Sequence, residues 1–228
     1  MTAAPCQLVF DLAHRQALGA EDFLVSSSNE AAVETIDRWP NWPHPASIVV
    51  GPQGSGKSHL ANVWRLRSGA GIVTAAALDD TAVAALADGA GLVVEDLDRG
   101  IADEKALFHL LNRARESKLS VLLTSRAPPG EQEFRIPDLR SRLRALPLVE
   151  VQPPDETLLK AVLVKLFADR QLNVEPPVID YLSLRMERSM AAAARVVAAV
   201  DRLALATHRK LTRPLAAQAL ASLGESRE

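Results

Sequence analysis

The sequence contains a single cysteine, Cys6, among its 228 residues. One thiol excludes an internal disulfide and a cysteine-rich metal site, and it is typical of a reducing compartment such as the cytoplasm. An excess of charge is also lacking, because 26 lysine and arginine residues face 28 acidic residues. The net charge of -2 offers no general attraction to nucleic acid or to anionic lipid, so any DNA contact has to be local or indirect.

Long apolar runs are absent too, and none approaches the roughly 20 residues that a membrane span requires. The N-terminus lacks the basic region and apolar core of a secretory signal. Hydrophobic residues make up 48% of the chain, which is enough to bury a sizeable core. We therefore expect a soluble cytoplasmic protein without membrane contact, with one large domain or one domain and a small appendage.

Short β-rich apolar runs alternate with helical patterns from residue 46 to about residue 151. This alternation is typical of parallel βαβ units with helices on both faces of the sheet. The predicted strands are Ser47–Val50, Gly71–Thr74, Gly91–Val94, Ser120–Thr124 and Leu146–Val151. The predicted helices lie near Lys57–Arg67, Asp80–Ala87, Glu104–Ser117 and Pro137–Leu143.

After Pro153-Pro154 the pattern is helical only. Asp155 fits an N-cap, and leucine and valine residues recur behind it at helical spacing. Further helices are predicted at about Pro177–Met186 and Met190–His208, and Thr212-Arg213-Pro214 opens a last short one. We expect an N-terminal segment, helix and linker at residues 1–45, an αβα core at 46–153 and a helical lid at 154–228.

Three prolines interrupt the segment Trp39–Pro45, which therefore cannot be a continuous helix and is interpreted as a linker into the first strand. Its two tryptophans and Trp64 are candidates for an exposed docking surface, since aromatic residues are enriched at binding hot spots. Packing of the linker against the domain is the favoured interpretation.

A phosphate-binding pattern follows the first predicted strand and precedes a helix. It consists of Gly51, Pro52, Gln53, Gly54, Ser55, Gly56, Lys57 and Ser58. In the pattern G-x-x-x-x-G-K-[ST], glycines let backbone N–H groups wrap phosphates where a Cβ would interfere. Lys57 is placed to contact the β- and γ-phosphates, and Ser58 supplies a hydroxyl to Mg²⁺. ADP or ATP with Mg²⁺ is thus the predicted ligand; the alternative is a chance glycine-rich turn.

A magnesium site also needs a carboxylate at the end of a neighbouring parallel strand. Glu95, Asp96 and Asp98 follow the apolar run Gly91–Val94. In a strand Glu95 and Asp96 point to opposite faces, so only one can face the metal directly. A solvated acidic turn is the alternative interpretation.

Several motifs together resemble the AAA+ module of the DnaA family, and they are closer to its shorter Hda members, the regulatory inactivators of DnaA. The motifs are FLVSSSNEAAVETIDRWPNWP, GSGKSHLANVW, LVVEDLD, VLLTSRAPP, IPDLRSRL and HRKLTRP, and the resemblance covers most of residues 7–223. It implies an α/β P-loop NTPase with a five-stranded parallel αβα sandwich, a small C-terminal helical lid, and nucleotide between them. DnaA carries a further DNA-binding domain, whereas this chain stops soon after its last predicted helix begins, so direct origin recognition is not expected.

The resemblance implies two partner-binding features. Gln7, Leu8, Phe10 and Leu12 are similar to the sliding-clamp-binding peptide of Hda, with Gln7 at the pocket rim and the other three in apolar pockets. The alternative is a tail that packs on the domain through the same side chains. Arg142 matches the arginine finger that acts across a subunit boundary on a transferred phosphoryl group. Arg140 and Arg144 compete with Arg142 for this role.

The chain departs from the family where hydrolysis is controlled. Glu95 stands at the position of the Walker B metal-binding aspartate, and Asp96 at that of the water-activating acid. The longer Glu95 side chain changes how the metal is held, which makes efficient hydrolysis in cis doubtful.

The two sensor positions depart from the family as well. Thr124 and Ser125 match sensor 1, but Arg126 replaces the aspartate that follows them. Ala191 replaces the lid arginine of sensor 2, and Arg195, one helical turn further on, is the candidate substitute, with Arg188 as another. Loss of that arginine weakens contact with the terminal phosphates.

These features favour an Hda-like negative regulator of replication initiation with weak or no ATPase of its own. It is expected to hold ADP, to dock on the β sliding clamp of DNA polymerase III and to stimulate hydrolysis of DnaA-bound ATP. DNA is then contacted only through the clamp, and nucleotide-dependent self-association is compatible with such a surface. The alternatives are an autonomous DnaA-type or helicase-loader ATPase and, less favoured, a small-molecule kinase.

Overall fold

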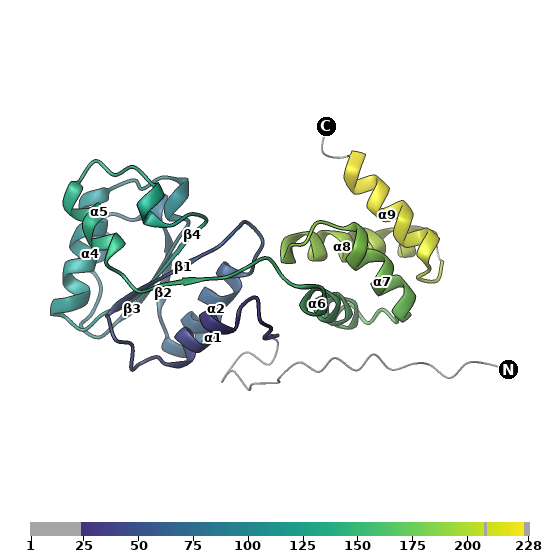
Figure 1. Cartoon of the computed structure of the whole chain (residues 1–228), viewed down its shortest axis with the longest axis horizontal. Helices are drawn as coiled ribbons and strands as arrows, with labels where there is room; N and C mark the ends of the chain where they lie inside the picture. The colour runs from purple at the N-terminus through teal and green to yellow at the C-terminus, as the bar shows by residue number, and fades with distance from the viewer. Residues whose placement is uncertain (1–23, 208, 226–228) are drawn as a thin grey trace. The chain divides into compact units, whose positions relative to one another are not determined.

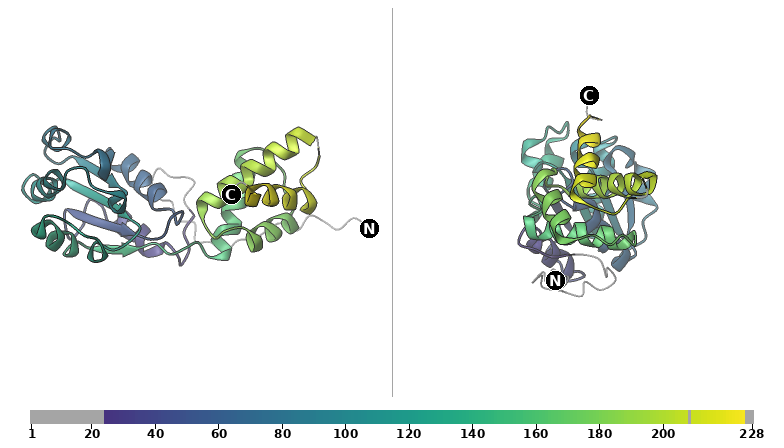
Figure 2. Two further views of the ribbon diagram at one scale, coloured as in Figure 1. Left: turned by 90° about the horizontal axis from the view of Figure 1, so that it is seen from above. Right: turned by 90° about the vertical axis from the view of Figure 1, so that its right-hand side faces the viewer.

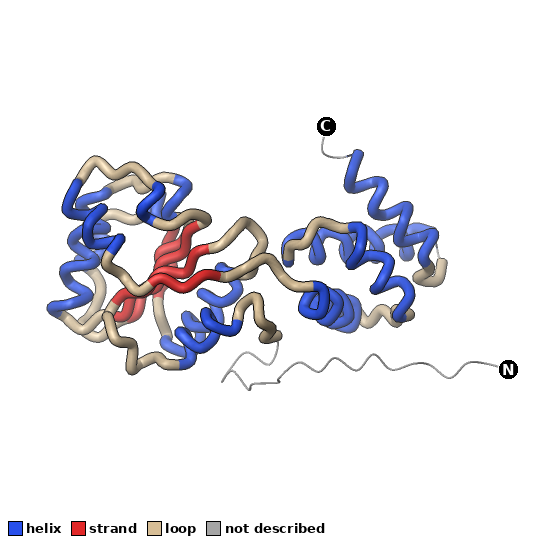
Figure 3. Tube along the Cα trace, in the orientation of Figure 1, coloured by secondary structure: helices blue, strands red, loops and turns tan. Residues whose placement is uncertain are grey.

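In the computed structural model, the described residues are 24–207 and 209–225. They form two units, of which the larger spans residues 29–152 and the smaller comprises residues 24–28 and 153–225 (Figure 1). All the described strands lie in the larger unit, and the smaller unit is helical (Figure 3).

The larger unit is built on a five-stranded parallel sheet in the order β2-β3-β4-β1-β5. The strands are β1 Ala46–Val50, β2 Gly71–Thr74, β3 Gly91–Glu95, β4 Ser120–Ser125 and β5 Leu148–Glu150. Every residue of β1 is buried, as expected for a central strand covered on both faces. The five-stranded αβα prediction is confirmed. The predicted strand Leu146–Val151 was too long at both ends, although the Pro147 carbonyl still accepts the Ile48 N–H and the Val151 N–H donates to the Val50 carbonyl.

Helices cover both faces of this sheet. They are α1 Glu30–Asp37, α2 Lys57–Ser68, α3 Asp80–Ala84, α4 Glu104–Glu116 and α5 Pro137–Arg144, with 3-10 turns η1 Ala75–Ala77, η2 Leu97–Arg99 and η3 Pro129–Glu131. The helices α1 and α2 lie together on one face, and α3, α4 and α5 share the apolar core of the other (Figure 1). Helix α3 ends before the predicted Ala87, because Arg113 of α4 donates from Nη2 to the Leu86 carbonyl at 2.9 Å.

The smaller unit consists of α6 Glu156–Asp169, α7 Pro176–Arg185, α8 Met190–Thr207 and α9 Arg213–Glu225 (Figure 2). The predicted N-cap is confirmed, since Asp155 Oδ1 accepts the Leu158 N–H at 2.7 Å. The last helix is 13 residues long rather than short, because Leu215, Ala216 and Ala219 extend its apolar face into the core of the unit. Among the described residues, no helix combines the length and apolar character needed to cross a membrane.

The three tryptophans form one cluster inside the larger unit. Trp42 stacks on Trp64 with ring centroids 5.1 Å apart, and Trp39 meets Trp64 edge-on at 6.2 Å. Trp39 donates from Nε1 to Ser120 Oγ at 3.1 Å, while Trp42 donates to the Thr35 carbonyl at 2.6 Å. The linker therefore packs on α2, as the favoured interpretation predicted, and Trp64 is completely buried.

Candidate nucleotide-binding site

The loop between β1 and α2 has the backbone shape that the glycine pattern predicts. Gly54 and Gly56 have φ values of 77° and 106°, in the left-handed region that favours glycine. A Cβ at Gly51 would overlap the carbonyl oxygen of Val151. The Gly51 N–H donates to the Ser125 carbonyl at 3.2 Å, which ties the start of the loop to the end of β4. Small residues are thus required at three positions of the loop.

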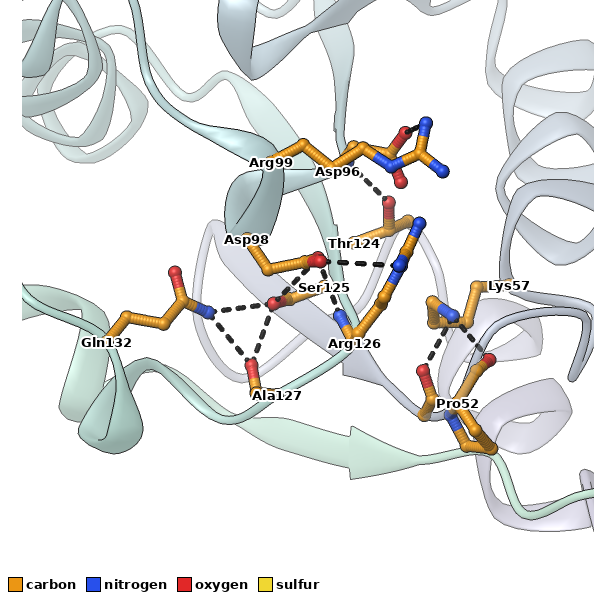
Figure 4. Close-up of polar contacts among 11 residues, drawn as sticks. Pro52, Lys57, Asp96, Asp98, Arg99, Thr124, Ser125, Arg126, Ala127 and Gln132 are labelled. Carbon is orange, nitrogen blue, oxygen red and sulfur yellow. Dashed lines mark hydrogen bonds and ion pairs between the residues drawn. The ribbon is translucent and has the colours of Figure 1, made fainter.

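Lys57, the first residue of α2, turns back onto this loop. Its ammonium donates to the carbonyl oxygens of Gly51 at 2.7 Å and Pro52 at 2.8 Å (Figure 4). Burial lowers the pKa of Lys57 below its usual 10.5; the charge of Asp98 opposes this effect and that of Arg126 adds to it. A phosphate in the loop would offer the ammonium a charged acceptor and favour its protonated form.

Two buried oxygens near the loop have no hydrogen-bond partner within the described part of the chain. They are Ser55 Oγ and Glu95 Oε1. A buried carboxylate oxygen without a partner is costly, and a bound cation would satisfy it. The residues therefore fit a nucleotide with Mg²⁺, for which Ser58 and Glu95 are the available oxygen ligands. No cluster of three or more acidic, histidine or cysteine residues suited to a metal occurs in residues 24–207 and 209–225.

Asp96 does not follow the strand alternation that the sequence suggested. The strand β3 ends at Glu95, and Asp96 adopts a left-handed conformation with φ 59°. Its N–H donates to Thr124 Oγ1 at 3.1 Å, and its carboxylate forms an ion pair with Arg99 at 3.4 Å (Figure 4). The strand alternation therefore does not apply to Asp96, which follows β3 and immediately precedes the 3-10 turn η2.

A polar cluster at the ends of β3 and β4 contains residues to which sequence reasoning assigned no role. Asp98 Oδ1 accepts the Arg126 N–H at 2.8 Å, and Asp98 Oδ2 lies 3.4 Å from Arg126 Nε (Figure 4). Ser125 Oγ lies 2.7 Å from the Ala127 carbonyl and accepts from Gln132 Nε2 at 2.8 Å. Its hydroxyl is thus engaged by the loop that follows β4. The sequence contained a signal for this cluster, because Asp98 is a third acid near the end of β3 and Arg126 stands where the resembling family has an aspartate.

The arginine-finger candidates lie on α5. The guanidinium of Arg142 lies over the Phe108 ring, 4.7 Å from its centroid, and Arg144 Nη2 donates to the Gly130 carbonyl at 3.4 Å. Arg140 is exposed, and its side chain forms no hydrogen bond or ion pair within the described residues. Glu104 of α4 accepts the Ile136 N–H at 2.9 Å and thereby holds the start of α5.

Arg195 and the residues predicted to bind the clamp do not belong to the described part of the larger unit. Arg195 belongs to the helical unit, where its guanidinium forms an ion pair with Glu187 at 3.5 Å. Gln7, Leu8, Phe10 and Leu12, which are predicted to bind the clamp, lie outside the described residues.

Two comparisons match parts of this sequence to known proteins. Residues 155–220 match the family model described as the lid domain of Hda. Over 102 residues the chain is 30% identical to the chromosomal replication initiator protein DnaA of Cutibacterium acnes. That match covers 43% of this chain and 20% of the relative, so the chain spans about a fifth of that protein's length.

Two solved structures have a similar fold. Domain III of the replication initiation protein DnaA from Thermotoga maritima has a TM-score of 0.74 and 17% sequence identity, and the match covers 89% of this chain and 95% of that domain. AMPPCP-bound DnaA from Aquifex aeolicus has a TM-score of 0.65 and 19% identity, with 79% and 64% of the two chains covered. The fold is therefore that of an AAA+ P-loop domain with a helical C-terminal region.

Proposed function

Because the chain is an AAA+ protein related to Hda and DnaA, we propose that it is a nucleotide-bound regulator that inactivates DnaA. The observation that carries the proposal is the match of residues 155–220 to the Hda lid domain, on a chain that also has a phosphate-binding loop. We propose ADP, or ATP, with Mg²⁺ as the ligand of residues 51–58. The nucleotide-bound DnaA with a similar fold supports this choice.

In the proposed complex each group of the loop has a separate task. The backbone N–H groups of the glycine-rich turn and the first turn of α2 hold phosphate oxygens. The Lys57 ammonium exchanges the carbonyls of Gly51 and Pro52 for phosphate. Ser58 and Glu95 hold Mg²⁺, which would neutralise phosphate charge when bound.

The acids after β3 favour weak hydrolysis in cis. A general base must lie within hydrogen-bond reach of the attacking water. The carboxylate of Asp96 is paired with Arg99, and its backbone N–H is held by Thr124. We therefore propose that the bound nucleotide mainly stabilises the folded protein and that the hydrolysed ATP belongs to DnaA.

The proposed action on DnaA occurs in trans through Arg142. An arginine supplied across a subunit boundary stabilises the charge of the transferred phosphoryl group and raises the rate by roughly 10³–10⁵. Glu104 orients the helix that carries Arg142, and the Phe108 ring supports its guanidinium. Residues 7–12 are proposed to dock the protein on the DNA-loaded sliding clamp.

The direct test is single-turnover hydrolysis of radiolabelled ATP preloaded on DnaA, with the clamp loaded on DNA. The unmodified protein is expected to accelerate hydrolysis, and Arg142→Ala is expected to remove most of the acceleration. Arg140→Ala, on the same helix, is the matched control and should retain it. ADP binding by each variant checks that the nucleotide site is intact.

The rival reading is an autonomous ATPase or helicase loader. If the protein binds nucleotide and clamp but leaves DnaA-bound ATP untouched, the inactivator proposal is wrong. Multiple turnover of ATP by the purified protein alone, abolished by Asp96→Asn, would then favour the autonomous ATPase.

A further inference from the structure

We propose that Arg126 determines nucleotide specificity: its guanidinium leaves Asp98 and binds the third phosphate when ATP replaces ADP. The inference rests on the proposed nucleotide site at residues 51–58. It assigns a function to the residue that stands where the resembling family has an aspartate.

The backbone places Arg126 beside the phosphate-binding loop. β4 pairs with β1 so that Ser125 lies opposite Val50, the last residue before the loop. The Ser125 carbonyl accepts the Gly51 N–H at 3.2 Å. Arg126 therefore leaves the sheet at the point where the loop begins, and its side chain extends between Asp98 and Lys57 (Figure 4).

This corner combines the cations of Lys57 and Arg126 with the carboxylates of Asp98, Asp96 and Glu95, of which Asp98 contacts Arg126. The positive charge of Arg126 is near enough to Lys57 to help lower the pKa of that ammonium, after the larger effect of burial. Two cations that face one space attract an anion with several oxygens. Asp98, with a side chain only 15% exposed, is the ion-pair partner of Arg126, whose side chain is 35% exposed.

The arrangement of Asp98 allows the exchange without loss of the loop. Asp98 Oδ1 accepts the Arg126 backbone N–H at 2.8 Å, whereas Oδ2 lies 3.4 Å from Nε of the guanidinium. The first contact positions the backbone and does not depend on the side chain of Arg126. The second is long for a charge-assisted contact, so a phosphate oxygen can replace it.

The test is calorimetric titration of the full chain with ADP and with AMPPCP, each with Mg²⁺. We expect Arg126→Ala to weaken AMPPCP binding about tenfold and to change ADP binding by less than about twofold, since one charged hydrogen bond is lost. Arg126→Lys keeps the positive charge and should retain part of the AMPPCP affinity that Arg126→Ala loses. Arg115→Ala, an exposed arginine on α4, is the matched control.

Asp98→Asn separates this role from a structural one. The amide oxygen can still accept the Arg126 N–H, but the guanidinium is no longer held by a charge, so AMPPCP should bind as tightly as before or more tightly. If the ion pair is merely structural, Arg126→Ala and Asp98→Asn should both weaken the binding of ADP and of AMPPCP to the same extent. Thermal unfolding midpoints measured without nucleotide show whether each variant is folded. If Arg126→Ala is not folded, the titrations of Arg126→Lys and Asp98→Asn test the proposal instead.

Failure of the specificity role and failure of the proposed nucleotide site give different results. Equal losses for both nucleotides, or an unchanged ratio in Arg126→Ala, overturn the specificity role and leave the nucleotide site in place. An unmodified protein that binds neither nucleotide overturns the proposed site itself, and the role of Arg126 with it.

Discussion

Replacement of Lys57 by alanine tests the nucleotide site through the stability of the protein. The ammonium is buried and bonded to the carbonyls of Gly51 and Pro52. Without nucleotide, its removal relieves a desolvated charge but leaves two carbonyls without their donor. These effects oppose one another, so the thermal unfolding midpoint of nucleotide-free Lys57→Ala should lie close to that of the unmodified protein.

With nucleotide the two proteins should differ clearly. A ligand at 100 times its Kd stabilises the folded state by about 2.7 kcal/mol. For a chain of this size, each kcal/mol raises the midpoint by about 2–4 °C, so ADP should raise it by about 5–10 °C. Loss of a charged phosphate contact costs about 1.5–3 kcal/mol, up to roughly a hundredfold in affinity. At the same ADP concentration the stabilisation then falls to about 0.4 kcal/mol, a shift of about 1 °C.

The assay is a thermal melt followed by circular dichroism, with and without Mg-ADP. Lys105→Ala, which removes an exposed lysine on α4, should keep the full ADP shift. If Lys57→Ala also keeps the full shift, Lys57 does not contact the phosphates and the proposed site is incorrect.

The lowered pKa of Lys57 adds a dependence on pH. In the folded, nucleotide-free protein this pKa lies below the unfolded value of 10.5, so the unfolded chain binds more protons between the two values. Stability from this group is therefore lowest below the folded pKa and rises with pH up to 10.5. In alkaline buffers the difference in stability between the unmodified protein and Lys57→Ala should change in that direction.

Three further substitutions have defined outcomes. Gly51→Ala forces a Cβ against the Val151 carbonyl and should lower the free energy of unfolding in urea by about 1–3 kcal/mol; an unchanged value would mean that the loop adapts freely. Trp64→Ala empties the centre of the tryptophan cluster and should cost about 3–5 kcal/mol in the same assay, whereas a loss below 1 kcal/mol would refute the importance of that packing. Glu104→Ala should speed amide hydrogen exchange at Arg135 and Ile136 without speeding it elsewhere, and unchanged exchange at these two amides would show that this carboxylate does not hold α5.

Local patterns were sufficient for much of the fold. The apolar runs at β1, β3 and β4 are buried because each lies between two helical layers, and a continuous apolar run is the expected sequence of such a strand. The bounds of the edge strand β5 were predicted less well, since its residues are exposed or half-buried and no continuous buried run marks its ends. Asp155 was identified as a cap because its hydrogen bond to Leu158 is local.

The sequence by itself determined the phosphate-binding loop, because the conformation of Gly54 and Gly56 and the start of α2 depend on neighbours within eight residues. Only the tertiary structure decided how the charges around that loop pair. Asp98 and Arg126 are 28 residues apart in the chain and meet because β3 and β4 are adjacent parallel strands whose ends lie at one edge of the sheet. Their pairing depends on strand order and register, which long-range packing sets and no local pattern contains.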